Sequence, residues 1–221
     1  MTVFSNFGKY GIVGAGGGGL GYSYLATAFA TTTNATLSGS NRIATLGSAG
    51  SFAYSNQFTL SGLLYIELEV VTTADRFIAG FSKFTGTVYS NNYWGPYNNV
   101  AGAGENVILS YGPAGSTGTG GMAVGSDILD AGGSKVPYLA NGHIISWAID
   151  VDAGKMWIGV NGVWHNGGGP AADSSPLTTG ITSGNVTDLR FRWSNHSATP
   201  GGAGKILTEA ESNYFNGGAL F

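Results

Sequence analysis

Two carboxylates in the segment LYIELEVV, Glu67 and Glu69, come closest to catalytic chemistry in residue type and spacing. They stand two positions apart, so a β-strand would carry both on one face. Paired carboxyl groups catalyse glycoside hydrolysis when they lie across a sugar and burial raises the pKa of one of them. The pair therefore raises the hypothesis of a glycan-cleaving enzyme.

The residues on either side of this pair favour a structural role for it. Polar and apolar residues alternate, which predicts a strand with Tyr65, Glu67 and Glu69 on its outer face. The core-facing residues are Leu64, Ile66, Leu68 and Val70. Arg190 and Arg192 alternate with apolar residues in the same way, so they are suitable cross-strand partners for carboxylates. We interpret all four as outer-face charges and expect that the protein is not an enzyme.

A second acidic group, Asp150 and Asp152 followed by Gly154, matches the start of a calcium loop. An EF-hand loop also needs an oxygen ligand at its third acidic position and a bidentate Glu at its end. Gly154 and Asn161 occupy those places here. Because Asp at a hairpin turn commonly accepts hydrogen bonds from backbone amides, we favour that structural role and expect no metal.

Other reactive side chains form no recognisable catalytic pattern. His143, His165 and His196 are too scattered for metal-ligand spacing, and no Ser stands in a G-x-S-x-G context. The chain has no cysteine, which excludes disulfides, thiolate nucleophiles and Cys-based metal sites. We expect neither a catalytic residue nor a cofactor.

A glycine run near the N-terminus contains the spacing of a dinucleotide-binding fingerprint, at Gly14, Gly16 and Gly19. That fingerprint works between a strand and a helix, with an acidic residue about 20 positions further on. No Asp or Glu stands near Gly39, and no βαβ pattern follows. We therefore interpret the run as part of a Gly-rich arm.

The segment NNYWGPYNN gathers aromatic and amide side chains around a Gly-Pro turn. Exposed rings flanked by amides suit sugar stacking or a hot spot of protein recognition, and loops on a rigid scaffold commonly carry such residues. In the alternative interpretation, Trp94 folds back over an open sheet edge. The candidate partner-binding residues are Tyr93, Trp94, Tyr97 and Asn98, together with Trp164 and His165.

The chain that must position these candidates is a series of short strands separated by turns. Residues 145–151 alternate with period two, Ala153-Gly154 forms a turn, and residues 155–160 form a second strand. Asn161-Gly162 suits a type I′ turn, because both central residues of that turn have positive φ. Val163-Trp164-His165 is the expected returning strand. The only expected helix outside the N-terminal arm is a short turn within residues 205–214.

This pair of hairpins resembles the closing half of a SPRY domain, in the form common in bacteriophage structural and tail proteins. The matching run is IDVDAGKMWIGVNGVW, followed by a small-residue loop and a proline. Segments 35–47, 64–71, 77–82, 188–193 and 214–221 resemble the family's other strands and its closing segment. The resemblance implies an all-β fold, a bent antiparallel β-sandwich (a SPRY or concanavalin-like jelly roll) that binds rather than catalyses. The insertion between Thr85 and Gly133 departs from the family pattern, so the family's partner-binding loops cannot be transferred.

Composition narrows the choice of partners. Only 10% of residues are charged, and the net charge of −3 comes with nine scattered basic residues. Nucleic-acid binding needs clustered Lys and Arg, so we expect no nucleic acid as a partner. No run approaches the roughly 20 apolar residues of a membrane span, and no signal peptide is recognisable, so we expect a soluble, unprocessed chain.

The first 34 residues differ from the rest, with Lys9 as their only charged side chain and four successive glycines at positions 16–19. We expect residues 1–34 to form a Gly-rich arm, and residues 35–221 to form the SPRY-like sandwich. Ordering such a segment is entropically costly, so the arm needs contacts with neighbouring subunits or with the sandwich, unless it is a flexible leader. Its candidate assembly residues are Phe4, Phe7, Tyr10, Tyr22 and Tyr24.

These observations favour a non-enzymatic phage virion protein, as a capsid decoration, fibre or tail component. We expect it to be assembled in the host cytoplasm as a homo-oligomer that binds other virion subunits. A host-surface glycan or protein is a further candidate partner. The alternatives are a free carbohydrate-binding, lectin-like module and a glycan-cleaving enzyme that uses Glu67 or Glu69.

Overall fold

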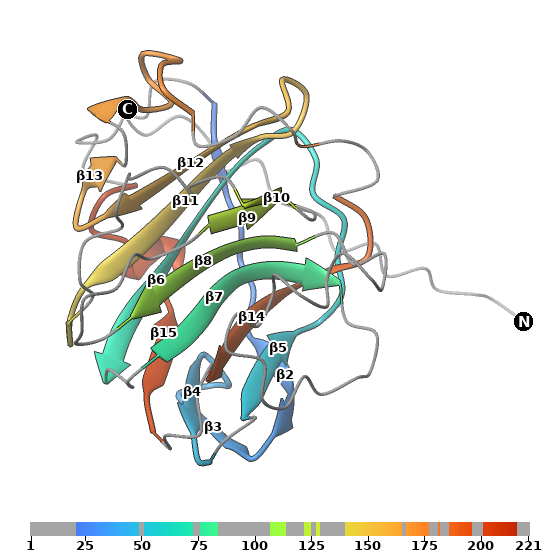
Figure 1. Ribbon diagram of the computed structural model, residues 1–221, viewed down its shortest axis with the longest axis vertical. Coiled ribbons are helices and arrows are strands. Elements are labelled where there is room, and N and C mark those ends of the chain that lie inside the picture. Colours follow the sequence, from blue (N-terminus) through green and yellow to red (C-terminus); the bar gives the residue numbers. More distant parts are fainter. Residues whose placement is uncertain are drawn as a thin grey trace, which may run out of the picture.

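The computed structural model describes residues 21–48, 51–72, 76–83, 107–113, 122–124, 127–128, 140–164, 167–176, 181, 186–195 and 201–215. Within these ranges the chain forms two sheets, antiparallel except for one short strand pair, and one short 3-10 helix, η2 (Glu209–Glu211). Figure 1 shows the sheets as two overlapping, curved layers. The predicted all-β sandwich is confirmed.

Each sheet combines strands from distant parts of the sequence. Sheet A has the order β13 (Val163–Trp164), β12 (Lys155–Val160), β11 (Ile144–Asp150), β6 (Leu63–Thr72), β15 (Ala203–Ile206), β4 (Ile43–Leu46) and β3 (Ala35–Ser38). A further strand, β1 (Ser23–Tyr24), pairs with β6 in parallel. Sheet B has the order β10 (Asp127–Ile128), β9 (Met122–Val124), β8 (Val107–Pro113), β7 (Arg76–Lys83), β14 (Leu189–Asn195), β5 (Phe52–Ser55) and β2 (Phe29–Thr33).

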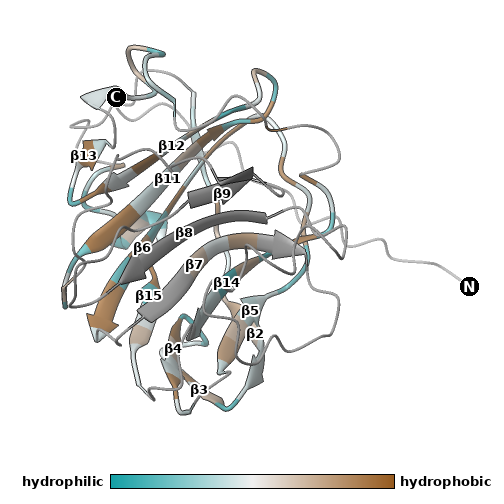
Figure 2. Ribbon diagram, in the orientation of Figure 1, coloured by the Kyte–Doolittle hydropathy of each residue, from teal (hydrophilic) through white to brown (hydrophobic). Residues whose placement is uncertain are grey.

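The main core lies between the two sheets and contains apolar residues from both. At its centre, Phe191 of β14 meets Phe81 edge-on at 5.2 Å and Trp147 of β11 edge-on at 5.4 Å. Figure 2 shows hydrophobic residues along β6 and β11, whose inward positions face this core. Each fully buried large apolar side chain contributes roughly 1.5–3 kcal/mol, so this cluster is the main stabilising element of the fold.

The predicted pair of hairpins is confirmed. Strands β11 and β12 pair antiparallel over their whole length, from Ile145 opposite Val160 to Asp150 opposite Lys155. Asn161 and Gly162 have φ of 50° and 77°, as the type I′ turn between β12 and β13 requires. Because strand side chains alternate between faces, this register directs one row of β11 side chains into the core and the other onto the outer face of sheet A.

The helical expectation for residues 205–214 holds for only three residues. Lys205 and Ile206 belong to β15, where they pair with β6, and the helical turn is limited to η2. Thr208 begins this turn with a capping box, since its hydroxyl accepts from the Glu211 amide while the Glu211 carboxylate accepts from the Thr208 amide. Sheet pairing by β15 therefore overrides the local helix propensity of its last residues.

Part of the expected N-terminal arm belongs to the sandwich. Strand β2 pairs with β5 in sheet B, and Phe29 at its start is buried in the main core. Leu25 is buried in the same core, and β1 pairs with β6. The boundary expected after Asn34 thus falls in the turn between β2 and β3. No helix in the described ranges is long and apolar enough to span a membrane.

Candidate functional site on the outer face of sheet A

The outer face of sheet A is covered, which corrects the expectation for Tyr65 and Glu67. Both side chains are fully buried, at 0% exposure, whereas Glu69 is half-buried. A second apolar cluster lies over them, separate from the main core. Its buried members are Tyr65, Ala148, Trp157 and Trp164, and the partly buried rings packed against them are Tyr22, Tyr24, Tyr214 and Phe215.

The rings of this outer cluster pack directly on Tyr65. Phe215 stacks on it with ring centroids 5.3 Å apart, and Trp164 meets it edge-on at 6.5 Å. Tyr24 meets Phe215 edge-on at 5.4 Å. Trp164 also lies so close to Gly169 that a Cβ there would be 2.5 Å from the indole. The outer face of sheet A is therefore covered by segments near both ends of the described chain, which contribute Tyr22 and Tyr24 at one end and Tyr214 and Phe215 at the other.

Glu67 lies beneath these rings with an uneven set of hydrogen bonds. Tyr65 donates its hydroxyl to Glu67 Oε1 at 2.6 Å, and Ser212 donates to the same oxygen at 2.8 Å. Glu67 Oε2 and the hydroxyl oxygen of Ser146 are buried without a hydrogen-bond partner in the described part of the chain. Ser146 stands opposite Glu67 in the β11–β6 register. Oε1 thus accepts two hydrogen bonds, whereas Oε2 is buried and accepts none in the described part of the chain.

The hydroxyls around Glu67 are held in their neutral, donating form. Burial, followed by the charge of Glu67, raises the pKa of Tyr65 above its ordinary range. The same two causes, in the same order, raise the pKa of Tyr24, whose hydroxyl donates to the Leu207 carbonyl at 3.1 Å. Neither tyrosine is therefore suited to act as a base.

The segment of residues 208–215, here called the C-terminal strap, crosses this face. At one side Glu211 forms ion pairs with Arg42 and Lys205, the latter at 3.0 Å. In the middle Ser212 bonds Glu67, and at the other side Tyr214 lies on the β12–β13 turn, where a Cβ on Gly162 would approach its ring to 2.6 Å. Arg42, followed by the Thr208 amide, lowers the pKa of Glu211 to about 2.

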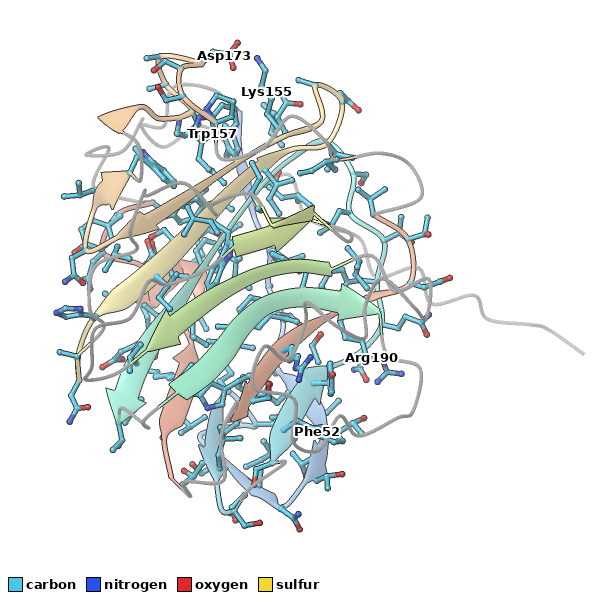
Figure 3. All side chains as sticks on the ribbon, in the orientation of Figure 1. Phe52, Lys155, Trp157, Asp173 and Arg190 are labelled. Carbon is cyan, nitrogen blue, oxygen red and sulfur yellow. The ribbon has the colours of Figure 1, made fainter. Side chains whose placement is uncertain are left out.

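One corner of sheet A carries an ion pair beside the outer cluster. Lys155 Nζ contacts both carboxylate oxygens of Asp173 at 2.7 Å, and the Trp157 indole donates to the Ser174 carbonyl at 2.9 Å. Figure 3 shows Lys155, Trp157 and Asp173 together at this end of the sandwich. Asp173 has a φ of 48°, a backbone conformation that few non-glycine residues adopt. The Lys155 ion pair and the Trp157 hydrogen bond hold its turn in this conformation from two sides.

The two arginines expected to pair with the glutamates lie in the other sheet. Strand β14 belongs to sheet B, so Arg190 and Arg192 are not cross-strand neighbours of Glu67 and Glu69. Arg192 is also buried rather than on a wet face, because it lies over the Tyr54 ring at 5.7 Å and donates from Nε to Ser194 at 2.8 Å. Arg190 is half-buried and bonds Thr31 and the Ser55 carbonyl.

Few of the predicted partner-binding residues fall within the described ranges. Trp164 is buried in the outer cluster, and Tyr22 and Tyr24 lie on the sandwich of their own chain. The other candidates, Tyr93, Trp94, Tyr97, Asn98 and His165 for binding and Phe4, Phe7 and Tyr10 for the arm, lie outside the described residues. The glycine fingerprint at residues 14–19 does so as well.

The acidic turn at Asp150 has the structural role that was favoured for it. Asp150 Oδ1 accepts a hydrogen bond from the Ala153 amide at 2.8 Å. Within the described ranges, no group of three or more His, Cys, Asp or Glu side chains is placed to hold a metal ion. The Glu67 carboxylate, the strongest acid–base candidate, is enclosed by Tyr65, Ser212 and their neighbours and cannot meet a substrate in this conformation.

Solved structures share this architecture. The SPRY domain of human HERC1 superposes with a TM-score of 0.54 at 16% identity, covering 82% of this chain and 98% of that domain. The fold is of the SPRY type. The TRIM65 PSpry domain gives a TM-score of 0.51 at 9% identity, covering 84% of this chain and 94% of its own. Stonustoxin gives 0.50 at 15% identity, covering 85% of this chain and 27% of its own. No protein-family model and no curated protein matches the sequence.

Sequence reasoning missed the residues that build the covered face of this SPRY-type sandwich. Ser212 bonds Glu67 across 145 positions of sequence, so no local pattern could have identified the contact. The aromatic pair Tyr214 and Phe215 was the one usable signal, because it lies in the segment that resembles the family's closing segment. Phe215 indeed packs on β6, through its stacking on Tyr65.

Proposed function

We propose that this chain is a non-enzymatic structural subunit of a bacteriophage virion, whose SPRY-type sandwich binds neighbouring subunits or a host surface. The observation that carries the binding role is the enclosure of Glu67 within a fold shared with the HERC1 SPRY domain. A buried carboxylate bonded to Tyr65 and Ser212 supports packing and not turnover. The hairpin sequence that resembles phage SPRY modules favours the virion.

The proposed assembly role rests on the residues that precede the sandwich. Tyr24 and Phe29 fix the start of the described chain to both sheets, so the residues before position 21 are the part to remove in a test. We expect the full chain to form a homo-oligomer that enters particles assembled in the host cytoplasm. A protein or glycan on the host surface is the second proposed partner.

A truncation separates this function from its alternatives. The full chain and a variant lacking residues 1–20 are compared by light scattering, by thermal unfolding and by immunogold labelling of virions produced with each. We expect the truncated chain to keep the unfolding temperature of the full chain and to lose oligomerisation and incorporation. Unlabelled virions with the full chain, together with glycan-array binding that survives truncation, would instead indicate a free lectin-like module. Turnover of a glycan that Glu67→Gln abolishes would indicate the enzyme.

A further inference from the structure

The C-terminal strap and the first described residues hold each other on the outer face of sheet A. Phe215 of the strap contacts both Tyr24 of β1 and Tyr65 of β6. Tyr24 in turn donates its hydroxyl to the Leu207 carbonyl, immediately before the strap. We call residues 22–24 and the strap together the terminal clasp. Its aromatic contacts belong to the outer cluster, whereas Leu25, which follows Tyr24, and Ile206, two residues before the strap, belong to the main core.

Closure of the clasp is favoured by apolar burial and by ion pairs. Four partly buried rings, those of Tyr22, Tyr24, Tyr214 and Phe215, are removed from water against the outer cluster. Glu211 adds its contacts with Arg42 and Lys205 at the far side of the sheet. These contacts explain why the clasp lies on the sheet.

The same closure is opposed by Glu67. A carboxylate transferred from water into an apolar layer loses hydration, and hydrogen bonds must replace that hydration to offset the cost. Tyr65 and Ser212 replace it at Oε1 only, and Oε2 remains without a partner in the described part of the chain. Opening the clasp would return water to Oε2.

We propose that the terminal clasp is a conformational latch, whose closed state the buried Glu67 carboxylate weakens enough for the clasp to open while the rest of the sandwich stays folded. The latch opens as a local unit, because its rings pack on the outer cluster, and the main core between the two sheets does not include them. Opening uncovers Tyr65, Glu67 and Trp157 and detaches β1 from β6. The inference concerns the clasp alone and stands independently of the proposed virion role.

Replacing the carboxylate by an amide of the same shape tests the latch. In Glu67→Gln, the amide oxygen still accepts from Tyr65 and Ser212, and the neutral amide costs less to bury than the carboxylate does. Glu69→Gln is the matched control, because it removes the same charge from the same strand at a half-buried position. The readout is amide hydrogen exchange at pH 7, followed in peptides that cover the clasp and in peptides that cover β11 and β12.

We expect Glu67→Gln to slow exchange in the clasp at least fivefold relative to wild type, with a smaller change in β11 and β12. Glu69→Gln should stay within twofold of wild type throughout. Unchanged or faster exchange in the clasp of Glu67→Gln would overturn the latch, and so would an unfolded Glu67→Gln chain, because the carboxylate would then be required for closure.

A second variant tests whether the clasp opens without the core. Phe215→Ala removes the strap ring that packs on both Tyr24 and Tyr65 and leaves the direct contact between those two tyrosines in place. We expect at least tenfold faster exchange in residues 208–215 and in β1, with the protection of β11 and β12 retained. Loss of protection in β11 and β12 to the same degree would show that the clasp and the core unfold as one unit, and the latch would be refuted.

Discussion

One glycine on the inner face of sheet A, Gly204, lies against an aromatic ring of sheet B. Gly204 of β15 stands beside Trp193 of β14, and a Cβ at residue 204 would lie 2.7 Å from the indole. Trp193 is fully buried, so its ring has little room to withdraw. The close approach of the two sheets at this point therefore depends on the absence of a side chain.

Gly204→Ala should destabilise the fold by about 1–3 kcal/mol, the usual cost of an added methyl group in a close-packed core. Chemical denaturation of wild type and variant measures this loss. The matched test is a double-mutant cycle with Trp193→Phe, whose smaller ring leaves space for the methyl group. Additive losses in the double variant would show that the predicted contact is not the cause.

The Glu211 carboxylate gives the fold a specific acid sensitivity. Its pKa is lowered from 4.5 to about 2 by Arg42 first and by the Thr208 amide second. A group with a lowered folded-state pKa contributes stability that is present above its unfolded pKa and is lost as the pH falls through its folded pKa. The contribution of Glu211 should therefore disappear between about pH 4.5 and pH 2.

Glu211→Gln tests that sign. The carboxyl is about a third exposed, so solvent screens its ion pairs, and we expect the variant to be less stable at pH 7 by only about 1 kcal/mol. Thermal unfolding from pH 7 to pH 2 should show the two chains converging as the pH falls. A constant difference across this range would contradict the assignment.

At the scale of elements, a comparison of two Asn-Gly turns measures how strongly Tyr214 of the strap packs on the β12–β13 turn. Gly162 and Gly142 have nearly the same positive φ, 77° and 81°. A Cβ at Gly162 would lie 2.6 Å from the Tyr214 ring, whereas nothing lies within 4 Å of a Cβ at Gly142. Substitution by Ala therefore imposes the same backbone strain at both sites but a clash at only one.

Gly162→Ala should lower the free energy of unfolding by about 1–2 kcal/mol more than Gly142→Ala, because only the first displaces Tyr214. Urea unfolding of both variants gives the comparison. In a chain that already carries Tyr214→Ala, Gly162→Ala should cost less unfolding free energy than it does in the wild type, because the ring that it displaces is absent. Equal losses of unfolding free energy in the two glycine variants would show that Tyr214 does not pack on the β12–β13 turn.

The elements that could be predicted from the sequence are those specified by local patterns. Strand β12 was predicted with its observed bounds, because apolar alternation and the Asn161-Gly162 dipeptide specify a strand and its turn without reference to the rest of the chain. The same alternation gave the wrong environment for Glu67. It correctly separated two faces of β6, but a pattern of period two contains no information about what covers each face.

At the scale of the whole molecule, the outer face of sheet A was unpredictable because it is built from distant segments. Tyr24 reaches Glu67 and Leu207 from 43 and 183 positions away, and Ser212 reaches Glu67 from 145. The resemblance to SPRY domains predicted the sandwich, but it carried no information on which charges lie inside. For the same reason, the Gly-rich composition of residues 1–34 could not show that the sheets include β1 and β2.

Truncation at two positions would test where the sandwich begins. Removing residues 1–34 deletes β1 and β2, and with them the buried Leu25 and Phe29 and the ring of Tyr24. Two fully buried side chains are worth roughly 3–6 kcal/mol, a large part of the 5–15 kcal/mol that stabilises a typical domain. Removing residues 1–20 leaves every one of these contacts in place.

We therefore expect the chain lacking residues 1–34 to be unfolded or aggregated at 37 °C, and the chain lacking residues 1–20 to unfold at the temperature of the full chain. Near-ultraviolet circular dichroism and scanning calorimetry measure both. Leu25→Ala with Phe29→Ala in the full-length chain is the matched control, because it removes the two core side chains but keeps the chain length. It should reproduce most of the loss caused by the longer truncation. If the longer truncation unfolds at the wild-type temperature, β1 and β2 add nothing to the core, and the sandwich begins at β3.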